Sequence, residues 1–145
     1  MRIRSTRAAA VVLGVAIALT GTACSTTTDT PVAVAQAPAF DGQHVSAAEW
    51  AAAAAEPGVR IIDVRTPEEF AAGHIAGAVN IDINSDDFVG LITALDPSKD
   101  YAVYCRSGNR SRAAIEAMSG MGYAHTIGLD GGITARANAG FPVTQ

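Results

Sequence analysis

One short segment of the sequence concentrates the residue types that nucleophilic chemistry requires. Cys105 is followed by Arg106-Ser107-Gly108-Asn109-Arg110. Gly108 and Asn109 are the residue types that best tolerate unusual backbone angles, so this segment is able to curl with its backbone N–H groups pointing inward. Such a ring of N–H groups binds anions. Cys105 is therefore a candidate nucleophile at the head of an anion-binding loop.

The charges and the helix expected around Cys105 favour its ionised form. Arg106 and Arg110 are cationic, and a helix expected from Ser111 directs the positive end of its dipole at the loop. These effects stabilise a thiolate, the nucleophilic form of cysteine, and would equally hold a persulfide or an oxyanion. The alternative is an inert, buried cysteine at a strand end. We favour the reactive interpretation, because two arginines and a glycine make poor core neighbours.

The length of the loop separates two kinds of chemistry. Tyrosine phosphatases and the related arsenate reductases place five residues between the nucleophilic cysteine and a phosphate-binding arginine. Here Arg110 follows Cys105 after four residues, and Arg112 lies one residue beyond the phosphatase spacing. The smaller ring suits a single sulfur anion better than a tetrahedral phosphoryl group. A phosphatase or arsenate reductase is thus the less favoured enzyme.

The chain around this loop alternates strand and helix patterns. Short apolar or β-branched runs predict strands at residues 59–64, 78–81, 101–104 and 125–129. Capping residues and helical spacing predict helices at residues 47–55, 67–72, 86–95, 111–121 and 132–138. This alternation predicts an α/β fold with a parallel sheet of about five strands and helices on both faces. Cys105 then stands at the carboxyl end of a strand, where such sheets form their active crevices.

Three of the expected helices begin at recognisable caps. Ser46 and Glu49 have the spacing of a capping box. Thr66 precedes Pro67, which is the typical arrangement of an N-cap with proline in the first helical position. Ser85 or Asp86 is expected to cap the third helix.

Three ordered groups of residues resemble the signatures of the rhodanese-like family, over residues 43–143. They are DVRTPEEF at 63–70 with GHIAGAVNI at 73–81, CRSGNRS at 105–111, and LDGGI at 129–133 with AGFPV at 139–143. Two positions depart from the family pattern: Ala76 replaces a usual proline, and Arg136 replaces a common tryptophan. An arginine at position 136 is expected to reach solvent or a carboxylate.

The resemblance implies a rhodanese-like fold and a single-domain sulfurtransferase. The Cys105 thiolate would take the outer sulfur of thiosulfate or of a persulfide donor and hold it as a persulfide. A thiol or cyanide would then remove the sulfur. Arg106 and Arg110 would attract the anionic donor, and the loop residues Arg106, Ser107, Gly108, Asn109 and Arg110 would bind it. The alternative is a sulfide-sensing, redox-sensing or binding module on the same fold that forms the adduct without turnover.

Other polar residues receive smaller roles. Asp63 and Arg65, at a strand end near the crevice, are expected to pair and fix neighbouring loops, and a contact from either to Arg110 is the lesser alternative. His44 and His125 have no ligand-like spacing to Cys105, so no metal ion is expected. No cofactor is expected either.

The N-terminus has the three parts of an export signal. Three arginines precede an apolar stretch at residues 8–19, which falls short of the ~20 residues that a membrane-spanning helix needs. Small residues then lead to Cys24, and this segment resembles the lipobox of bacterial lipoproteins, although Leu19 lies five residues before the cysteine rather than three. A cut after Ala35 and an uncleaved anchor are the alternatives.

These features predict the domain organisation and the location of the protein. We expect a signal peptide at residues 1–23, a lipidated Cys24, a flexible tether over residues 24–42 rich in Thr, Ala, Pro and Gln, and one domain at residues 43–145. The protein would be exported to the cell envelope, on the outer face of the cytoplasmic membrane or in the periplasm. The lipid would be its only contact with the membrane.

The charge and the cysteine count limit the possible partners. Loss of the three N-terminal arginines takes the formal charge from −4 to −7, which disfavours nucleic acid as a partner. Arg106, Arg110 and Arg112 form a basic island on this acidic protein and suit a small anionic substrate. Lipidation of Cys24 would leave Cys105 without a partner, whereas a Cys24–Cys105 disulfide is the alternative.

Overall fold

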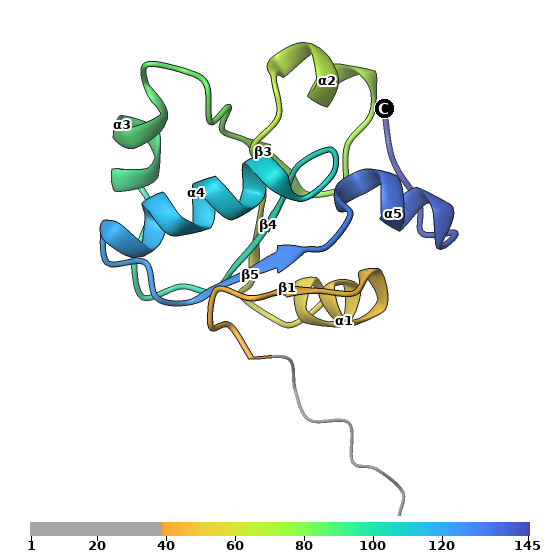
Figure 1. The fold of residues 1–145 in the computed structure, drawn as a ribbon, viewed down its shortest axis with the longest axis horizontal. Coiled ribbons are helices and arrows are strands. Elements are labelled where there is room, and N and C mark those ends of the chain that lie inside the picture. The colour runs from red at the N-terminus through yellow and green to blue at the C-terminus, as the bar shows by residue number, and fades with distance from the viewer. Residues whose placement is uncertain (1–38) are drawn as a thin grey trace, which may run out of the picture. The chain divides into compact units, whose positions relative to one another are not determined.

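The fold is a five-stranded parallel sheet with helices on both faces (Figure 1), in a computed structural model that describes residues 39–145. The strands are β1 (His44–Val45), β2 (Arg60–Asp63), β3 (Ala78–Asn80), β4 (Tyr101–Tyr104) and β5 (Thr126–Leu129). The helices are α1 (Ala47–Ala54), α2 (Pro67–Ala72), α3 (Phe88–Thr93), α4 (Asn109–Gly120) and α5 (Gly132–Asn138). The order across the sheet is β1-β5-β4-β2-β3, and every pair is parallel. The predicted α/β fold is confirmed.

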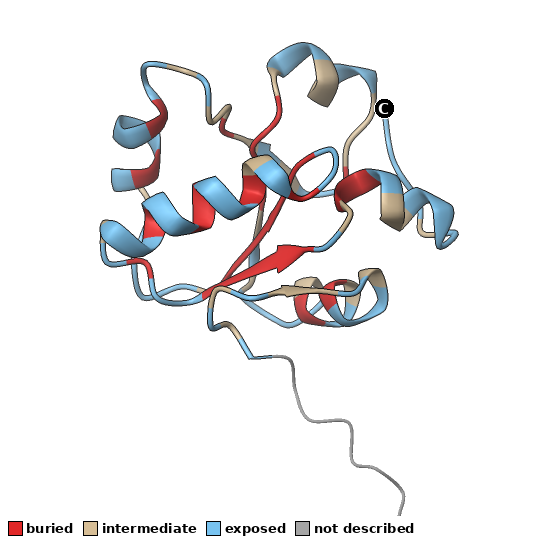
Figure 2. Cartoon of the chain, viewed as in Figure 1, coloured by how far each residue is buried: buried red, intermediate tan, exposed pale blue. Residues whose placement is uncertain are grey.

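The central strand β4 divides the core into two layers by its alternation. Tyr101, Val103 and the following Cys105 belong to the layer that packs under α3 and α4. Ala102 and Tyr104 belong to the opposite layer, under α1 and α5. All four residues of β4 and of β5 are buried, as Figure 2 shows, which explains their continuous apolar character. The end of β4 is therefore held between two packed helical layers.

The caps of the first two helices are confirmed. The Ser46 hydroxyl accepts from the Glu49 N–H at 3.4 Å, and the Glu49 carboxylate accepts from the Ser46 N–H at 3.1 Å. Thr66 and Glu69 form the same reciprocal box at the start of α2, with Pro67 in the first helical position. The prediction for α3 is wrong: Asp87 is its N-cap and makes no side-chain cap, while the Ser85 hydroxyl accepts from the Asp87 N–H.

Two further differences bear on the site. Strand β1 was missed because two residues show no alternation; only its pairing with β5 defines it. Helix α4 begins at Asn109, two residues before the expected start at Ser111, because Gly108 adopts a left-handed conformation and serves as the N-cap. The dipole of α4 thus begins inside the loop after Cys105.

The domain begins slightly before the expected boundary at residue 43. Phe40 packs against the core layer under α1, and the Gly42 N–H donates to the Thr126 carbonyl at 2.7 Å. The expected signal peptide, Cys24 and most of the tether lie outside the described residues. No helix within residues 39–145 is long and apolar enough to cross a membrane.

Candidate active site

Cys105 lies directly after β4, at the carboxyl end of the sheet, and its side chain has no exposed surface. Within residues 39–145 it has no disulfide partner. The loop of Arg106, Ser107 and Gly108 separates it from α4, and both Arg106 and Ser107 are exposed. The exposed loop therefore covers the Cys105 sulfur and keeps it from solvent.

Gly108 aims a backbone donor at the sulfur. Its N–H donates to Cys105 Sγ at 3.1 Å. Its φ of 99° lies in the left-handed region, which residues other than glycine rarely adopt, so the turn requires a glycine. Asn109 is the exposed first residue of α4, and its expected contact with the donor stays a prediction.

The Ser111 hydroxyl is a second hydrogen-bonding group beside the sulfur and was not among the predicted site residues; the Cys105 thiol donates to its oxygen. Ser111 is buried in the first turn of α4, with Oγ 3.7 Å from Cys105 Sγ. Its hydroxyl donates to the Gly108 carbonyl at 2.9 Å and also contacts His44 Nε2 at 2.9 Å. The loop, α4 and β1 therefore meet at this one hydroxyl group.

These donors lower the pKa of the Cys105 thiol. Burial, the largest single effect, disfavours the thiolate and acts to raise the pKa. Hydrogen bonds from the backbone and hydroxyl of Ser111 and from the backbone N–H groups of Ser107 and Gly108 together outweigh burial, and the net pKa lies below that of an ordinary cysteine. The cradle thus favours the nucleophilic form without a direct ion pair to the sulfur.

Helix α5 braces the loop from behind through two backbone hydrogen bonds. The Ile133 N–H donates to the Cys105 carbonyl at 2.9 Å, and the Thr134 N–H donates to the Arg106 carbonyl at 3.3 Å. Gly132 makes this approach possible: an added Cβ would overlap the carbonyl groups of Cys105 and Arg106, and φ is 61°. Gly132 was expected only to open a helix; its close contact with the Cys105 loop appears only in the fold.

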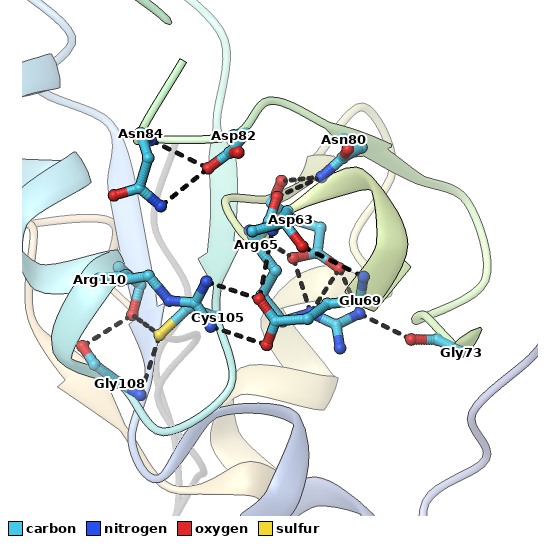
Figure 3. A network of polar contacts seen from close by, with 12 residues as sticks. Asp63, Arg65, Glu69, Gly73, Asn80, Asp82, Asn84, Cys105, Gly108 and Arg110 are labelled. Carbon is cyan, nitrogen blue, oxygen red and sulfur yellow. Dashed lines mark hydrogen bonds and ion pairs between the residues drawn. The ribbon is translucent and has the colours of Figure 1, made fainter. Parts of the chain in front are cut away.

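Arg110 is turned toward a carboxylate that was not predicted (Figure 3). Its Nη1 and Nη2 donate to Glu69 Oε2 and Oε1 at 2.6 and 2.8 Å. Hydrogen bonding from Arg110 is the main reason that the pKa of Glu69 falls to about 2. The sequence patterns predicted no role for Glu69, since nothing in them pairs positions 41 residues apart. In this structure the Arg110 charge is paired with Glu69, and Arg110 also interacts electrostatically with Cys105; its expected contact with an incoming anion stays a prediction.

Asp63 and Arg65 pair with each other, as Figure 3 shows. Arg65 Nη2 donates to Asp63 Oδ2 at 2.6 Å and to the Gly73 carbonyl at 2.7 Å, and both side chains are buried. The Asn80 amide donates to the carbonyls of both residues. The pair therefore ties the ends of β2 and β3 to the residues after α2. The alternative contact to Arg110 is not made: among the described residues its ion-pair partner is Glu69.

Two other arginines differ from expectation. Arg112 forms an exposed ion pair with Asp130 at 2.8 Å, so it does not add to a free basic island.

Arg136 is half-buried and lies over the rings of Trp50 and Phe141 at 5.6 and 4.9 Å. Its Nε and Nη1 have no hydrogen-bond partner among residues 39–145. It therefore occupies its site by stacking rather than by meeting a carboxylate.

The described residues contain no group of three or more side chains of the kinds that hold a metal ion. What they bring together at the carboxyl edge of the sheet is one sulfur surrounded by hydrogen-bond donors. Such a group is suited to nucleophilic attack and to holding a small covalently attached anion.

Comparisons with known proteins place this domain among relatives of the same fold. A family model described as a rhodanese-like domain matches residues 46–139. A sulfurtransferase of Allochromatium vinosum is 34% identical over 85 residues, 59% of this chain and 78% of the relative. The thiosulfate sulfurtransferase GlpE of Ectopseudomonas mendocina is 38% identical over 76 residues, 52% of this chain and 67% of the relative. A rhodanese-related protein of Thermoplasma volcanium superposes with a TM-score of 0.62 at 33% identity, over 70% of this chain and 97% of that chain.

Proposed function

Because the chain belongs to the rhodanese-like domain family, we propose that it is a sulfurtransferase in which Cys105 carries the transferred sulfur as a persulfide. The relatives named as sulfurtransferases support this class of activity. The observation that carries the proposal is the 3.1 Å hydrogen bond from the Gly108 N–H to Cys105 Sγ, at the start of α4. It marks the sulfur as the centre of an anion cradle.

The first step transfers a sulfur atom to the enzyme. The Cys105 thiolate attacks the outer sulfur of thiosulfate and forms a sulfur–sulfur bond. The sulfur–sulfur bond of thiosulfate breaks, and sulfite leaves with the bonding electron pair. Cys105 then carries a persulfide anion, whose charge the N–H groups of the loop stabilise. A persulfide donor would react in the same way, with its thiolate as the leaving group.

The second step returns the enzyme to its starting state. Cyanide or an acceptor thiolate attacks the outer sulfur of the persulfide, and thiocyanate or a new persulfide leaves. The bond to Sγ breaks, and its electron pair stays on Cys105 as a thiolate. The donors that lower the pKa of Cys105 also make it a good leaving group in this step.

Access to the sulfur requires the loop or its neighbours to move, since Cys105 has no exposed surface. Arg106 is exposed beside it and has no ion-pair partner among the described residues, so its charge is available to draw in an anionic donor. Arg110 is already held by Glu69.

The cellular location of the protein depends on residues outside the described part of the chain. We propose export and lipidation at Cys24, because the N-terminal pattern is that of a lipoprotein signal. Labelling with a fatty-acid probe tests this, with Cys24→Ala as the comparison. The label and membrane association should disappear in the variant; unchanged association would contradict the lipid anchor.

Turnover is tested by mixing the protein with thiosulfate and cyanide and measuring thiocyanate. Varying both substrates should give the parallel double-reciprocal lines of a two-step covalent mechanism. Cys105→Ala should abolish thiocyanate formation, while Cys24→Ala should not. An adduct on Cys105 without turnover would favour a sensing or binding module. Absence of both adduct and turnover would refute the proposal.

A further inference from the structure

Behind the nucleophile lies a histidine from a distant part of the sequence. His44 stands on the edge strand β1, and its Nε2 lies 2.9 Å from Ser111 Oγ. Ser111 in turn lies 3.7 Å from Cys105 Sγ. These contacts form a continuous chain from the imidazole through the hydroxyl to the sulfur.

The backbone of the neighbouring strand is shaped to admit this ring. Gly128 of β5 pairs with His44 in the parallel ladder. An added Cβ at Gly128 would overlap three atoms of the imidazole. Glycine weakens a strand interior unless something must approach closely, and here the approaching group is His44. The ring is thus held against β5 with Nε2 at Ser111.

Three charged or ionisable groups face His44. They are Arg112 of α4, the Asp130 carboxylate after β5, and the sulfur of Cys105 reached through Ser111. Burial is the main reason that the pKa of His44 is lowered, and Arg112 lowers it further against the effect of Asp130. A neutral imidazole with a proton on Nε2 is able to donate to the Ser111 oxygen.

We propose that His44 is a positioning residue that acts on Cys105 through Ser111, an inference that rests on the proposed role of Cys105 as the sulfur carrier. A hydroxyl group has one proton. When His44 donates to Ser111 Oγ, that proton is free to turn from the Gly108 carbonyl toward the sulfur. The hydroxyl then stabilises the thiolate before attack, and again when Sγ leaves the transferred sulfur. No proton moves from one residue to another in this arrangement.

The thiolate itself provides the test, since it absorbs ultraviolet light and needs no substrate. The thiolate absorbance of each full-length variant is recorded as a function of pH. The same titration of that variant with Cys105→Ala added is subtracted as background. His44→Ala should lower the thiolate fraction at neutral pH by about five-fold, the effect of one hydrogen bond of about 1 kcal/mol. His44→Gln should restore it, because its amide keeps a donor near the position of Nε2.

Matched variants separate positioning from a merely structural role. His125→Ala removes an exposed histidine before the start of β5 and should leave the titration unchanged. Ser111→Ala should lower the thiolate fraction, and adding His44→Ala to it should have no further effect. If His44→Ala does not fold, His44→Asn replaces it, because that shorter amide does not reach Ser111.

The inference is overturned if His44→Ala, or the Asn variant, titrates like the unaltered protein. It is also overturned if His44→Ala acts equally strongly when Ser111 is already alanine. Intact mass after thiosulfate treatment is recorded for each variant alongside. A shifted titration without any sulfur adduct would sustain the role of His44 and refute the sulfurtransferase proposal, so the two failures are distinguishable.

Discussion

The two sides of Cys105 are built from different interactions. On the side of α4 and α5, neutral groups contact the sulfur and its loop: the Gly108 N–H, the Ser111 hydroxyl and the first N–H groups of α5. On the side of β2 and α2, full charges pair with each other, Asp63 with Arg65 and Glu69 with Arg110. Dipoles therefore hold the sulfur, and ion pairs hold the scaffold around it.

This division has a chemical consequence. An arginine in contact with a thiolate would stabilise it strongly and make it a poorer nucleophile, because nucleophilicity falls with pKa. Hydrogen bonds from neutral donors lower the pKa of Cys105 against the effect of burial, and Arg110, held by Glu69, acts on the thiolate only from a distance. The same donors serve the thiolate and the persulfide, since both are anions on sulfur.

The largest effect on stability should come from the buried charged pair. Asp63→Ala leaves Arg65 buried without its partner and should lower the free energy of unfolding by about 3–5 kcal/mol. Asp130→Ala breaks the exposed pair with Arg112 and should cost less than about 1 kcal/mol. Denaturant unfolding measures both. Equal losses would contradict the assignment of Asp63 to the scaffold.

The brace from α5 should be the next most sensitive feature. Gly132→Ala forces a Cβ into the Cys105 and Arg106 carbonyls at a positive φ and should cost about 1–3 kcal/mol of stability. Sulfur transfer should fall more than ten-fold as the loop is displaced, a loss of about 1.4 kcal/mol or more in transition-state stabilisation. Gly140→Ala is the control, because its φ is also positive but its Cβ would meet open space. Similar loss of activity in both variants would show that the contact is unimportant.

The hydroxyl beside the sulfur should have a smaller effect on activity, and one that depends on pH. Ser111→Ala removes one hydrogen-bonding group and should slow persulfide formation about ten-fold at neutral pH, with a loss of stability of about 1–3 kcal/mol from its other buried contacts. Because the thiol pKa rises, activity should recover as the pH increases. Stopped-flow measurement of sulfite release across pH checks this. A pH-independent loss would mean that Ser111 acts through structure and not through the thiolate.

The smallest effect should come from the second charged pair. The pKa of Glu69 falls to about 2 in the fold, from 4.5, so Arg110 stabilises the folded state above pH 4.5 and loses this effect as the pH falls through 2. Glu69→Gln should therefore be less stable than the unaltered protein at neutral pH, by about 1 kcal/mol or less, with the difference closing in acid. Acid titrations of unfolding test this, and a difference that widens in acid would contradict it.

Local features of the sequence predicted the site well where the chain itself supplies the geometry. The loop after Cys105 is contiguous, so its glycine and its N–H groups could be recognised from residues 105–110. The capping box at Ser46 and the N-cap at Thr66 involve partners three residues apart and were equally predictable. In each case the structure follows from short-range hydrogen bonding.

The features that were missed depend on residues that meet only in the fold. Glu69 reaches Arg110 across 41 residues, and His44 reaches Ser111 across 67. Strand β1 exists only through its pairing with β5. The stacking of Arg136 depends on where α1 places Trp50. Secondary-structure propensity and hydrophobic periodicity describe single elements, so they do not predict contacts between residues that are far apart in the sequence.

The central claim is that Cys105 accepts a sulfur atom in a cradle of neutral donors. Intact mass measurement of the full-length protein after thiosulfate treatment, followed by peptide mapping, tests it most directly. The account predicts the mass of one added sulfur, located on the peptide that contains Cys105, lost on addition of cyanide and absent from Cys105→Ala. An unchanged mass, or added sulfur that persists in Cys105→Ala, would contradict it.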